Sequence, residues 1–130
     1  MMLVDTYLAQ SVVDGLGLFA AVDIPVGTKI WQFDDGFDII LDEKDFARMP
    51  DWQAKYFLKY CFKFQGRYFF CVDNARYMNH SAEPNTYESP EATWSSRDIK
   101  AREEIMCDYR RMGVTQEDLV HNMQNITVLK

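Results

Sequence analysis

The sequence lacks the long hydrophobic run that a membrane-spanning helix requires. Such a helix needs about 18 or more consecutive apolar residues, and no segment of the 130 residues approaches that length. The start of the chain carries Asp5 and no basic residue ahead of an apolar stretch, which is not typical of a secretory signal peptide. We therefore expect an intracellular, cytoplasmic protein with no membrane partner.

Cysteine is scarce, and no two cysteines lie at close spacing. The three cysteines, Cys61, Cys71 and Cys107, are odd in number and form no CxxC pair. This pattern argues against a disulfide framework and against a structural zinc site. We expect a reducing compartment and no metal.

Basic residues are too few for a surface that binds nucleic acid. Lys and Arg number 14 against 20 Asp and Glu, which gives a formal net charge of −6. A nucleic-acid interface needs clustered cations to neutralise phosphates, so we expect no direct nucleic-acid contact. The acidic balance is compatible with a basic protein partner.

Internal repeats, low-complexity tracts and linkers are also absent. The chain has 130 residues, 48% of them hydrophobic, which is too rich in core-forming residues for disorder and leaves no room for a second core. The sequence therefore predicts a single domain over residues 1–130.

What the sequence does contain is a series of short β-prone segments separated by Gly, Pro or polar residues. These segments are Thr6–Val13, Leu16–Asp23, Thr28–Asp34, Phe37–Leu41, Arg67–Val72, Asn85–Glu88, Thr93–Ile99 and Glu103–Tyr109. Many short strands with few helices predict a mostly β fold, of α+β type, without a parallel doubly wound sheet.

A helix is predicted in the middle of the chain. Asp51 is a candidate N-cap, and aromatic and apolar residues recur after it at helical spacing as far as Phe64. Three lysines fall on the opposite stripe, which we interpret as a solvated helix face: Lys55, Lys59 and Lys63.

The C-terminal tail has its own helix signals. Thr115 is a candidate N-cap with Asp118 three residues later, and Leu119 and Met123 are four residues apart. We expect a helix over Thr115–Asn125 whose Leu119 and Met123 can cover apolar surface.

Three stretches carry candidate functional residues, and each also has an ordinary structural interpretation. The glycine pair in Asp14–Ala20 is either a plain turn or a backbone that approaches a ligand closely. It is not a dinucleotide motif, because Ala20 occupies the third glycine position between strands. The amide and imidazole of Asn79 and His80 either satisfy a local turn or hold a polar ligand. Tyr109 ends a predicted strand and could be a half-buried aromatic.

Taken in chain order, these stretches resemble the SET domain of protein-lysine methyltransferases, in particular the compact stand-alone SET proteins of bacteria and large viruses. The resemblance covers roughly residues 6–109 and is carried by Gly15–Ala20, Asp23–Ile30, Arg76–Asn85 and Arg97–Tyr109. It implies the β-clip fold, in which small curved sheets surround a knot-like core. A short helical insert at about 42–65 and a tail at 110–130 would complete the domain.

The resemblance also implies an activity and its residues. S-adenosylmethionine would donate a methyl group to the ε-amine of a lysine in a basic protein or peptide, leaving S-adenosylhomocysteine and needing no metal. Tyr109 matches the active-site tyrosine of the family. The residues that would hold the cofactor are Gly15, Leu16, Gly17, Leu18, Arg76, Asn79, His80 and Tyr109.

The chain departs from the family pattern in four places, the first being Ala82, where a cysteine usually follows Asn79–Ser81. Arg102 stands where the family has a turn glycine, and Arg111 stands two residues after Tyr109, where many members have an aromatic. No cysteine-rich segment follows Tyr109, so the site must be closed by the 110–130 tail or by a second subunit of a homodimer. These departures keep two alternatives open, a SET-fold binding module with little or no turnover and a β-clip domain without cofactor.

Overall fold

The computed structural model describes residues 1–89, 91–113 and 115–124. The structure consists mostly of short strands in small sheets and has few helices among the described residues. This arrangement confirms the predicted mostly β fold class. The elements follow in the order β1 (Thr6–Gln10), β2 (Leu16–Ala20), β3 (Lys29–Gln32), β4 (Ile39–Leu41), α1 (Glu43–Ala47), α2 (Asp51–Tyr60), β5 (Phe62–Phe64), β6 (Arg67–Phe70), the 3₁₀ helix η1 (Asn74–Tyr77), β7 (Asn79–His80), β8 (Thr86–Ser89), β9 (Ala92–Ser95), β10 (Met106–Cys107), the 3₁₀ helix η2 (Tyr109–Arg111) and α3 (Gln116–Gln124).

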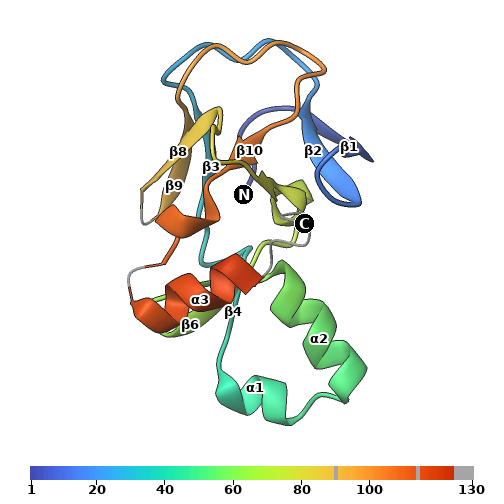
Figure 1. Ribbon diagram of the computed structural model, residues 1–130, viewed down its shortest axis with the longest axis vertical. Coiled ribbons are helices and arrows are strands. Elements are labelled where there is room, and N and C mark those ends of the chain that lie inside the picture. The colour runs from blue at the N-terminus through green and yellow to red at the C-terminus, as the bar shows by residue number, and fades with distance from the viewer. Residues whose placement is uncertain (90, 114, 125–130) are drawn as a thin grey trace.

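Within the described residues, the strands form four small sheets, in the orders β1–β2, β3–β9–β8, β4–β6–β5 and β10–β7. Figure 1 shows β3, β8 and β9 on one side of the molecule, β1 and β2 on the other, and β10 between them, with the three α-helices gathered at one end. The pair β7–β10 is parallel, and the other pairs of strands are antiparallel. Within the described part of the chain, no helix is long and apolar enough to cross a membrane.

Two hydrophobic clusters fill the interior. The larger one brings together side chains from β2, the turn after it, β3 and the segments around β7 and β10: Leu18, Ala20, Ile24, Ile30, Met78, Ile99, Ile105 and Cys107. The smaller one, around Cys61, Tyr68 and Phe70, lies under the helical insert. The larger cluster therefore joins the first twenty residues of the domain to the segments that precede and follow β10.

The predicted middle helix is present, but it ends earlier than its apolar spacing suggested. Pro50 is the N-cap and Asp51 is the first helical residue, so the predicted Asp51 cap is wrong. The chain leaves the helix after Tyr60 and forms the β5–β6 hairpin, whose two turn residues Gln65 and Gly66 both have positive φ, 50° and 74°. Two such residues suit the tight turn that matches strand twist.

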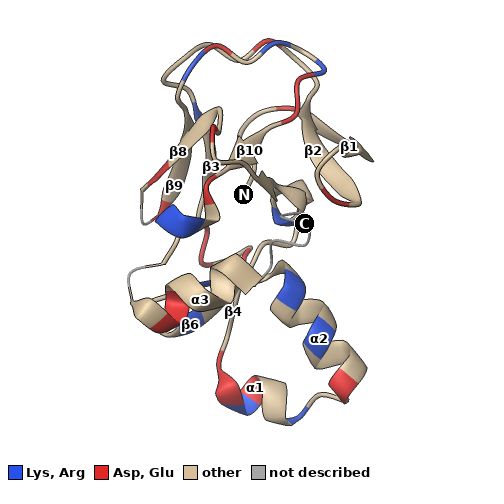
Figure 2. Ribbon diagram, viewed as in Figure 1, with Lys and Arg blue, Asp and Glu red and all other residues tan. Residues whose placement is uncertain are grey.

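One lysine of the predicted solvated stripe lies elsewhere. Lys63 is in β5, its side chain is buried, and it pairs with Glu117 of α3. Lys55 and Lys59 do lie on the exposed side of α2, on which Figure 2 shows Lys and Arg in blue. The helix α1, which precedes α2, was not predicted; Asp42 caps it, and its side chain and that of Asp45 accept bonds from each other's backbone N–H.

The tail helix begins as predicted, but its inward face differs. Thr115 Oγ1 accepts a bond from the backbone N–H of Asp118 at 3.0 Å, which confirms the predicted cap. The buried residues of α3 are Asp118 and Asn122, four residues apart, whereas Leu119 and Met123 are only half-buried. Residue Asn125, in the predicted range, lies outside the described residues.

Polar contacts join this buried face of α3 to the β5–β6 hairpin. The Asn122 side chain accepts a bond from Lys63 N–H at 2.8 Å and donates one to the Lys63 carbonyl at 3.0 Å. Asp118 accepts a bond from Gly66 N–H at 3.2 Å. The tail is therefore attached to the domain by hydrogen bonds to main-chain groups.

Arg102 adopts a backbone conformation that favours glycine. Its φ is +76°, in the left-handed region, and its side chain is exposed. Its N–H donates a bond to the Ala20 carbonyl at 2.7 Å, so the turn is fixed against β2. A residue with a Cβ pays strain there of about 1–2 kcal/mol.

We expect Arg102→Gly to raise the free energy of unfolding by about 1 kcal/mol, because the gain from relieving the strain exceeds the extra entropy of glycine in the unfolded chain. Urea unfolding at neutral pH measures it. Arg102→Ala is the matched control, since it removes the same exposed side chain and keeps the Cβ. Equal stabilities for the glycine and alanine variants would show that the turn is not strained.

Candidate active site

Asn79 connects segments that are far apart in the sequence. Its side-chain amide group lies within bonding distance of the carbonyls of Asp14 and Leu16, at 3.1 and 3.3 Å, and of Glu104 Oε1 at 3.3 Å. Asn79 begins β7, which pairs with β10 in the register Asn79 to Met106. The side chain is thus engaged by the glycine turn on one side and by the segment before β10 on the other.

The two glycines of the turn are needed for different reasons. Gly15 has a φ of +47° and open space where a Cβ would project. A Cβ on Gly17 would lie 1.9 Å from Glu104 Oε1, so no larger residue fits there without displacing that carboxylate. The sequence suggested close approach of a ligand to this turn; at Gly17 the group that approaches closely is a protein side chain.

Glu104 is a site residue that the sequence did not reveal. Adjacent acidic residues in a turn are ordinarily solvated, yet Glu104 is only 9% exposed. The segment 103–105 runs beside β2, with Ala20 N–H bonded to the Glu103 carbonyl at 3.0 Å and Ile105 N–H to the Leu18 carbonyl at 2.7 Å. This pairing turns Glu104 inward, and nothing in a pair of adjacent acids distinguishes the buried one.

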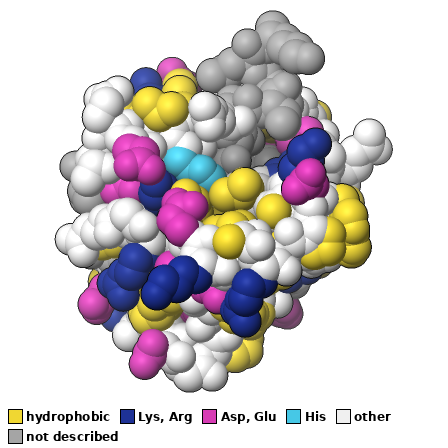
Figure 3. Space-filling model, turned by 90° about the horizontal axis from the view of Figure 1, so that it is seen from below, with side chains coloured by type: hydrophobic (Ala, Val, Ile, Leu, Met, Phe, Trp, Pro, Cys, Tyr) yellow, Lys and Arg dark blue, Asp and Glu magenta, His cyan; other side chains and the backbone are white. Residues whose placement is uncertain are grey.

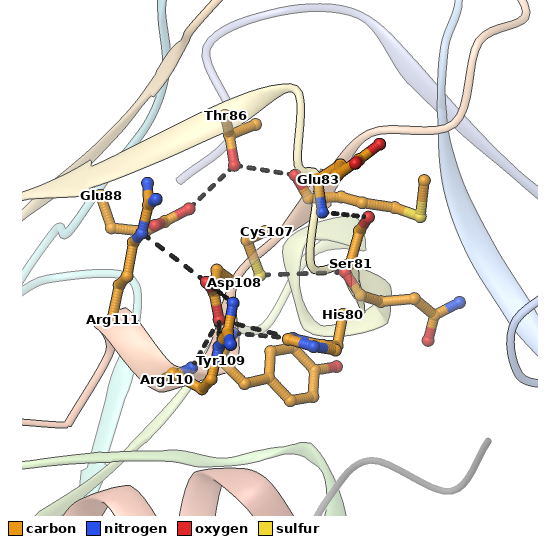
Figure 4. Close-up of polar contacts among 12 residues, drawn as sticks. His80, Ser81, Glu83, Thr86, Glu88, Cys107, Asp108, Tyr109, Arg110 and Arg111 are labelled. Carbon is orange, nitrogen blue, oxygen red and sulfur yellow. Dashed lines mark hydrogen bonds and ion pairs between the residues drawn. The ribbon is translucent and has the colours of Figure 1, made fainter. Parts of the chain in front are cut away.

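His80 and Tyr109 are held together by backbone and ring contacts (Figure 4). The Tyr109 N–H donates to His80 Nδ1 at 3.1 Å, and the two ring centroids are 5.4 Å apart. Nδ1 is therefore an acceptor, which fixes the neutral tautomer with the proton on Nε2. Burial lowers the pKa of His80, although the nearby Asp108 carboxylate acts in the opposite direction.

The tyrosine is fixed at its hydroxyl as well. Tyr109 Oη donates to the Met78 carbonyl at 2.8 Å, and burial raises the pKa of the phenol far above its usual range. Tyr109 opens η2 and does not end a strand, which corrects the predicted strand Glu103–Tyr109. The side chain of Asp108 caps η2 by accepting from Arg110 N–H at 3.0 Å.

Beside Tyr109 lies a cavity of about 180 Å³ with a largely apolar and aromatic wall. Its lining comes from β3, the end of α2, the β5–β6 hairpin, η1, β8, β9, η2 and α3: Trp31, Lys59, Tyr60, Cys61, Phe62, Phe64, Cys71, Ala75, Arg76, Met78, Glu88, Ser89, Thr93, Tyr109, Arg111, Met112 and Asn122. The cavity thus lies between the β core and the elements of the helical insert and tail.

Arg76 is held at the wall of this cavity by aromatic rings. Its guanidinium lies 5.4 Å from the Phe70 ring centroid and 4.9 Å from that of Tyr77. One terminal nitrogen donates to the Val72 carbonyl and the other contacts Tyr77 Oη, at 3.2 and 3.1 Å. Nε is buried and has no hydrogen-bond partner among the described residues.

The predicted site residues therefore fall into two groups. Arg76 and Tyr109 line the cavity, whereas Gly15–Leu18, Asn79 and His80 are not among its lining residues. Asn79 contacts the glycine turn and His80 contacts Tyr109. Asn79 and His80 are adjacent in β7, so this strand connects the glycine turn, which Asn79 contacts, to Tyr109 at the cavity, which His80 contacts.

Neither a metal cluster nor a uniform charged patch marks this site. Among the described residues, no group of three or more His, Cys, Asp or Glu side chains could hold a metal ion. The face in Figure 3 mixes acidic, basic and hydrophobic side chains.

Comparison with known proteins gives a consistent assignment. The family model for the SET domain matches residues 15–110. The chain is similar to one in a humanised mutant of the Chaetomium thermophilum Polycomb Repressive Complex 2 bound to an inhibitor, at 21% identity and a TM-score of 0.62, covering 84% of this chain and 15% of that one. A Plasmodium falciparum protein, provisionally a histone methyltransferase, matches at 15% identity and a TM-score of 0.57, with 87% and 95% covered. Curated proteins give no significant match.

The lowered pKa of His80 predicts a loss of stability in mild acid. Below the unfolded value of about 6.5, the unfolded chain binds protons before the folded one, so the contribution of His80 to stability is complete above that pH and is lost as pH falls. His121, whose pKa burial also lowers, acts in the same direction, and Glu88, whose pKa burial raises, acts against them.

The contribution of His80 is measured as a difference between two proteins. Urea unfolding of the parent and of His80→Gln at about pH 7.5 and pH 5.5 should show a smaller decrease in the variant. Asp108, whose pKa is lowered chiefly by Arg110, titrates below this range. Identical decreases in the two proteins would show that His80 does not resist protonation.

Proposed function

The chain belongs to the SET-domain family, and we propose that it transfers the methyl group of S-adenosylmethionine to the ε-amine of a lysine in a protein. One observation carries the proposal. The residue that matches the family's active-site tyrosine, Tyr109, lines a largely apolar cavity and is fixed by His80 and by the Met78 carbonyl. A rigid hydroxyl beside an apolar cavity is suited to orienting an amine.

The residues present fit the cofactor at two places. The buried Nε of Arg76, which lacks a partner among the described residues, can donate to a carboxylate such as the one at the amino-acid end of the cofactor. The Gly15 turn has open space outside its backbone. The cofactor supplies an already activated methyl group on a sulfonium. The residues that we assign to holding the cofactor are Gly15, Leu16, Gly17, Leu18, Arg76, Asn79, His80 and Tyr109.

Asn79 acts in this proposal mainly through the turn. Its amide N–H groups are directed at the Asp14 and Leu16 carbonyls and at Glu104, so they hold the turn in place. The His80 ring has the corresponding role for Tyr109. Both residues keep binding groups in a fixed geometry, which is how a site of this kind lowers a barrier.

The hydroxyl of Tyr109 can act on the amine as an acceptor. Its proton is donated to the Met78 carbonyl, which leaves an oxygen lone pair for an N–H group of the substrate. The substrate must be neutral, and presenting a neutral lysine amine at pH 7 costs about 4.6 kcal/mol. A cavity lined by rings such as Trp31, Tyr60 and Phe62 disfavours the ammonium by desolvation.

The partner that these features favour is a basic protein. The net charge of −6 attracts a lysine-rich segment. Histones are basic proteins of this kind, and the similar Plasmodium falciparum protein is provisionally a histone methyltransferase. Asn122 of α3 lines the cavity, so the chain's own tail helps to close it; closure by the second subunit of a homodimer is the alternative.

We expect S-adenosylhomocysteine to bind the parent protein in a calorimetric titration. Asn79→Ala should weaken this binding by about 1.5–3 kcal/mol, roughly 10- to 100-fold, because the glycine turn loses its anchor. Asn74→Ala is the matched control, since Asn74 is a neighbouring amide whose side-chain nitrogen donates to Thr6 Oγ1 at 3.4 Å. A folded Asn79→Ala protein with parental affinity would remove Asn79 from the site.

We expect Tyr109→Phe to lower kcat for labelled-methyl transfer to histones by about 100-fold or more, because the hydroxyl acts on the reacting amine. Affinity for S-adenosylhomocysteine should change little. Tyr87→Phe, a partly exposed tyrosine of β8, is the control for loss of a hydroxyl. If the parent binds cofactor but methylates no protein, the alternative of a SET-fold binding module is favoured.

A further inference from the structure

The cavity beside Tyr109 has an uneven distribution of charge. Among the described residues that line it, Glu88 is the single carboxylate, and the cations are Lys59, Arg76 and Arg111. The lining therefore offers one acidic position, which is unassigned in the proposed site.

The two oxygens of Glu88 are in different situations. Oε1 lies 2.8 Å from Thr86 Oγ1. Oε2 is shielded from solvent and has no hydrogen-bond partner among the described residues. A shielded carboxylate oxygen without a donor is unfavourable, so this side of Glu88 is one at which a cation or a proton would be stabilised.

Thr86 gives Glu88 a partner in either protonation state. Thr86 Oγ1 is also 2.8 Å from the Met106 carbonyl, so its single proton faces two acceptors. When Glu88 is ionised, the hydroxyl can donate to it. When Glu88 is protonated, the carboxylic acid can donate to Thr86 Oγ1, whose own proton then satisfies Met106 (Figure 4).

The charges around Glu88 shift its pKa in opposite directions, and the effect of burial on this pKa is larger. Burial raises its pKa, Asp108 acts in the same direction, and Arg111 and the Thr86 hydroxyl act against it. Arg111 lies 3.7 Å from Asp108 Oδ2, and no ion pair joins it to Glu88 among the described residues. The Arg76 guanidinium is engaged by Val72 and Tyr77.

We propose that Glu88 is the general base of the site, an inference that rests on the proposed methyl transfer. Its carboxylate takes a proton from the substrate ammonium, giving a carboxylic acid and a neutral amine. The amine lone pair then forms the N–C bond as the C–S bond breaks, and that electron pair stays on sulfur as a thioether. The acid returns its proton to water.

The first test is cation binding, which requires no turnover. Protein labelled with ¹³C at the glutamate carboxyls is titrated with pH in the presence of n-butylammonium, which has the length of a lysine side chain, or of the neutral n-butanol. The Glu88 signal is assigned with Glu88→Gln. The ammonium should lower the pKa of Glu88 by about one unit or more, and butanol should not.

Glu91, exposed in the same hairpin and outside the cavity lining, is the internal control. If n-butylammonium leaves the pKa of Glu88 unchanged, or lowers the pKa of Glu91 equally, the assignment is overturned. If Glu88 responds but the parent methylates no histone, the cation site stands and the proposed function is what has failed.

The second test is the pH dependence of labelled-methyl transfer to histones. Glu88→Gln should lower kcat/KM by about 100-fold at pH 7. The defect should shrink at least tenfold by about pH 9.5, where a larger share of lysine is neutral without a base. The parent rate should fall as pH decreases through the pKa of Glu88, since the protonated acid cannot accept a proton.

Two variants separate a base from a structural carboxylate. Glu91→Gln makes the same charge change outside the cavity and should keep parental activity. Glu88→Asp keeps a carboxylate and should retain more activity than Glu88→Gln, with a similar pH profile to the parent. A Glu88→Gln defect of constant size at every pH would show that the residue only supports the fold, and no defect would exclude it as the base.

Discussion

The burial of the Glu104 carboxylate against Gly17 is the contact on which the arrangement of the domain depends. Burying an ionisable side chain is costly unless polar partners surround it, and Asn79 supplies such a partner at 3.3 Å. Meeting this requirement fixes the distance between β2, β7 and the segment before β10 at once. Asn79 also pairs with Met106 in the parallel β7–β10 pair, so the same residue joins this contact to the strand that leads to Tyr109.

The site is built from constrained groups. Tyr109 is fixed at both its backbone N–H and its hydroxyl, and Arg76 is fixed by two aromatic rings. A site held in this way needs little reorganisation when a substrate enters. Glu88 differs, because the hydrogen bond that it makes with Thr86 can reverse its direction. The proposed methyl transfer would use the rigid groups for orientation and Glu88 for the change in protonation.

The sequence predicted those features that local chemistry encodes. Short β-prone segments between turn residues were enough for the fold class, and Thr115 was enough for the start of α3. The end of α2 was missed because the aromatic residues of β5 continue the helical spacing, and the break depends on the Gln65–Gly66 turn. Glu104 was missed because its burial is decided by pairing with a strand more than eighty residues earlier.

The way in which α3 is attached has a consequence for association between molecules. β5 is an edge strand of its sheet, and such an edge offers unpaired main-chain groups to strands of other chains. Asn122 occupies both the N–H and the carbonyl of Lys63. A side chain thus takes the place of a neighbouring strand at this position, so the tail blocks pairing of another chain with β5 at Lys63.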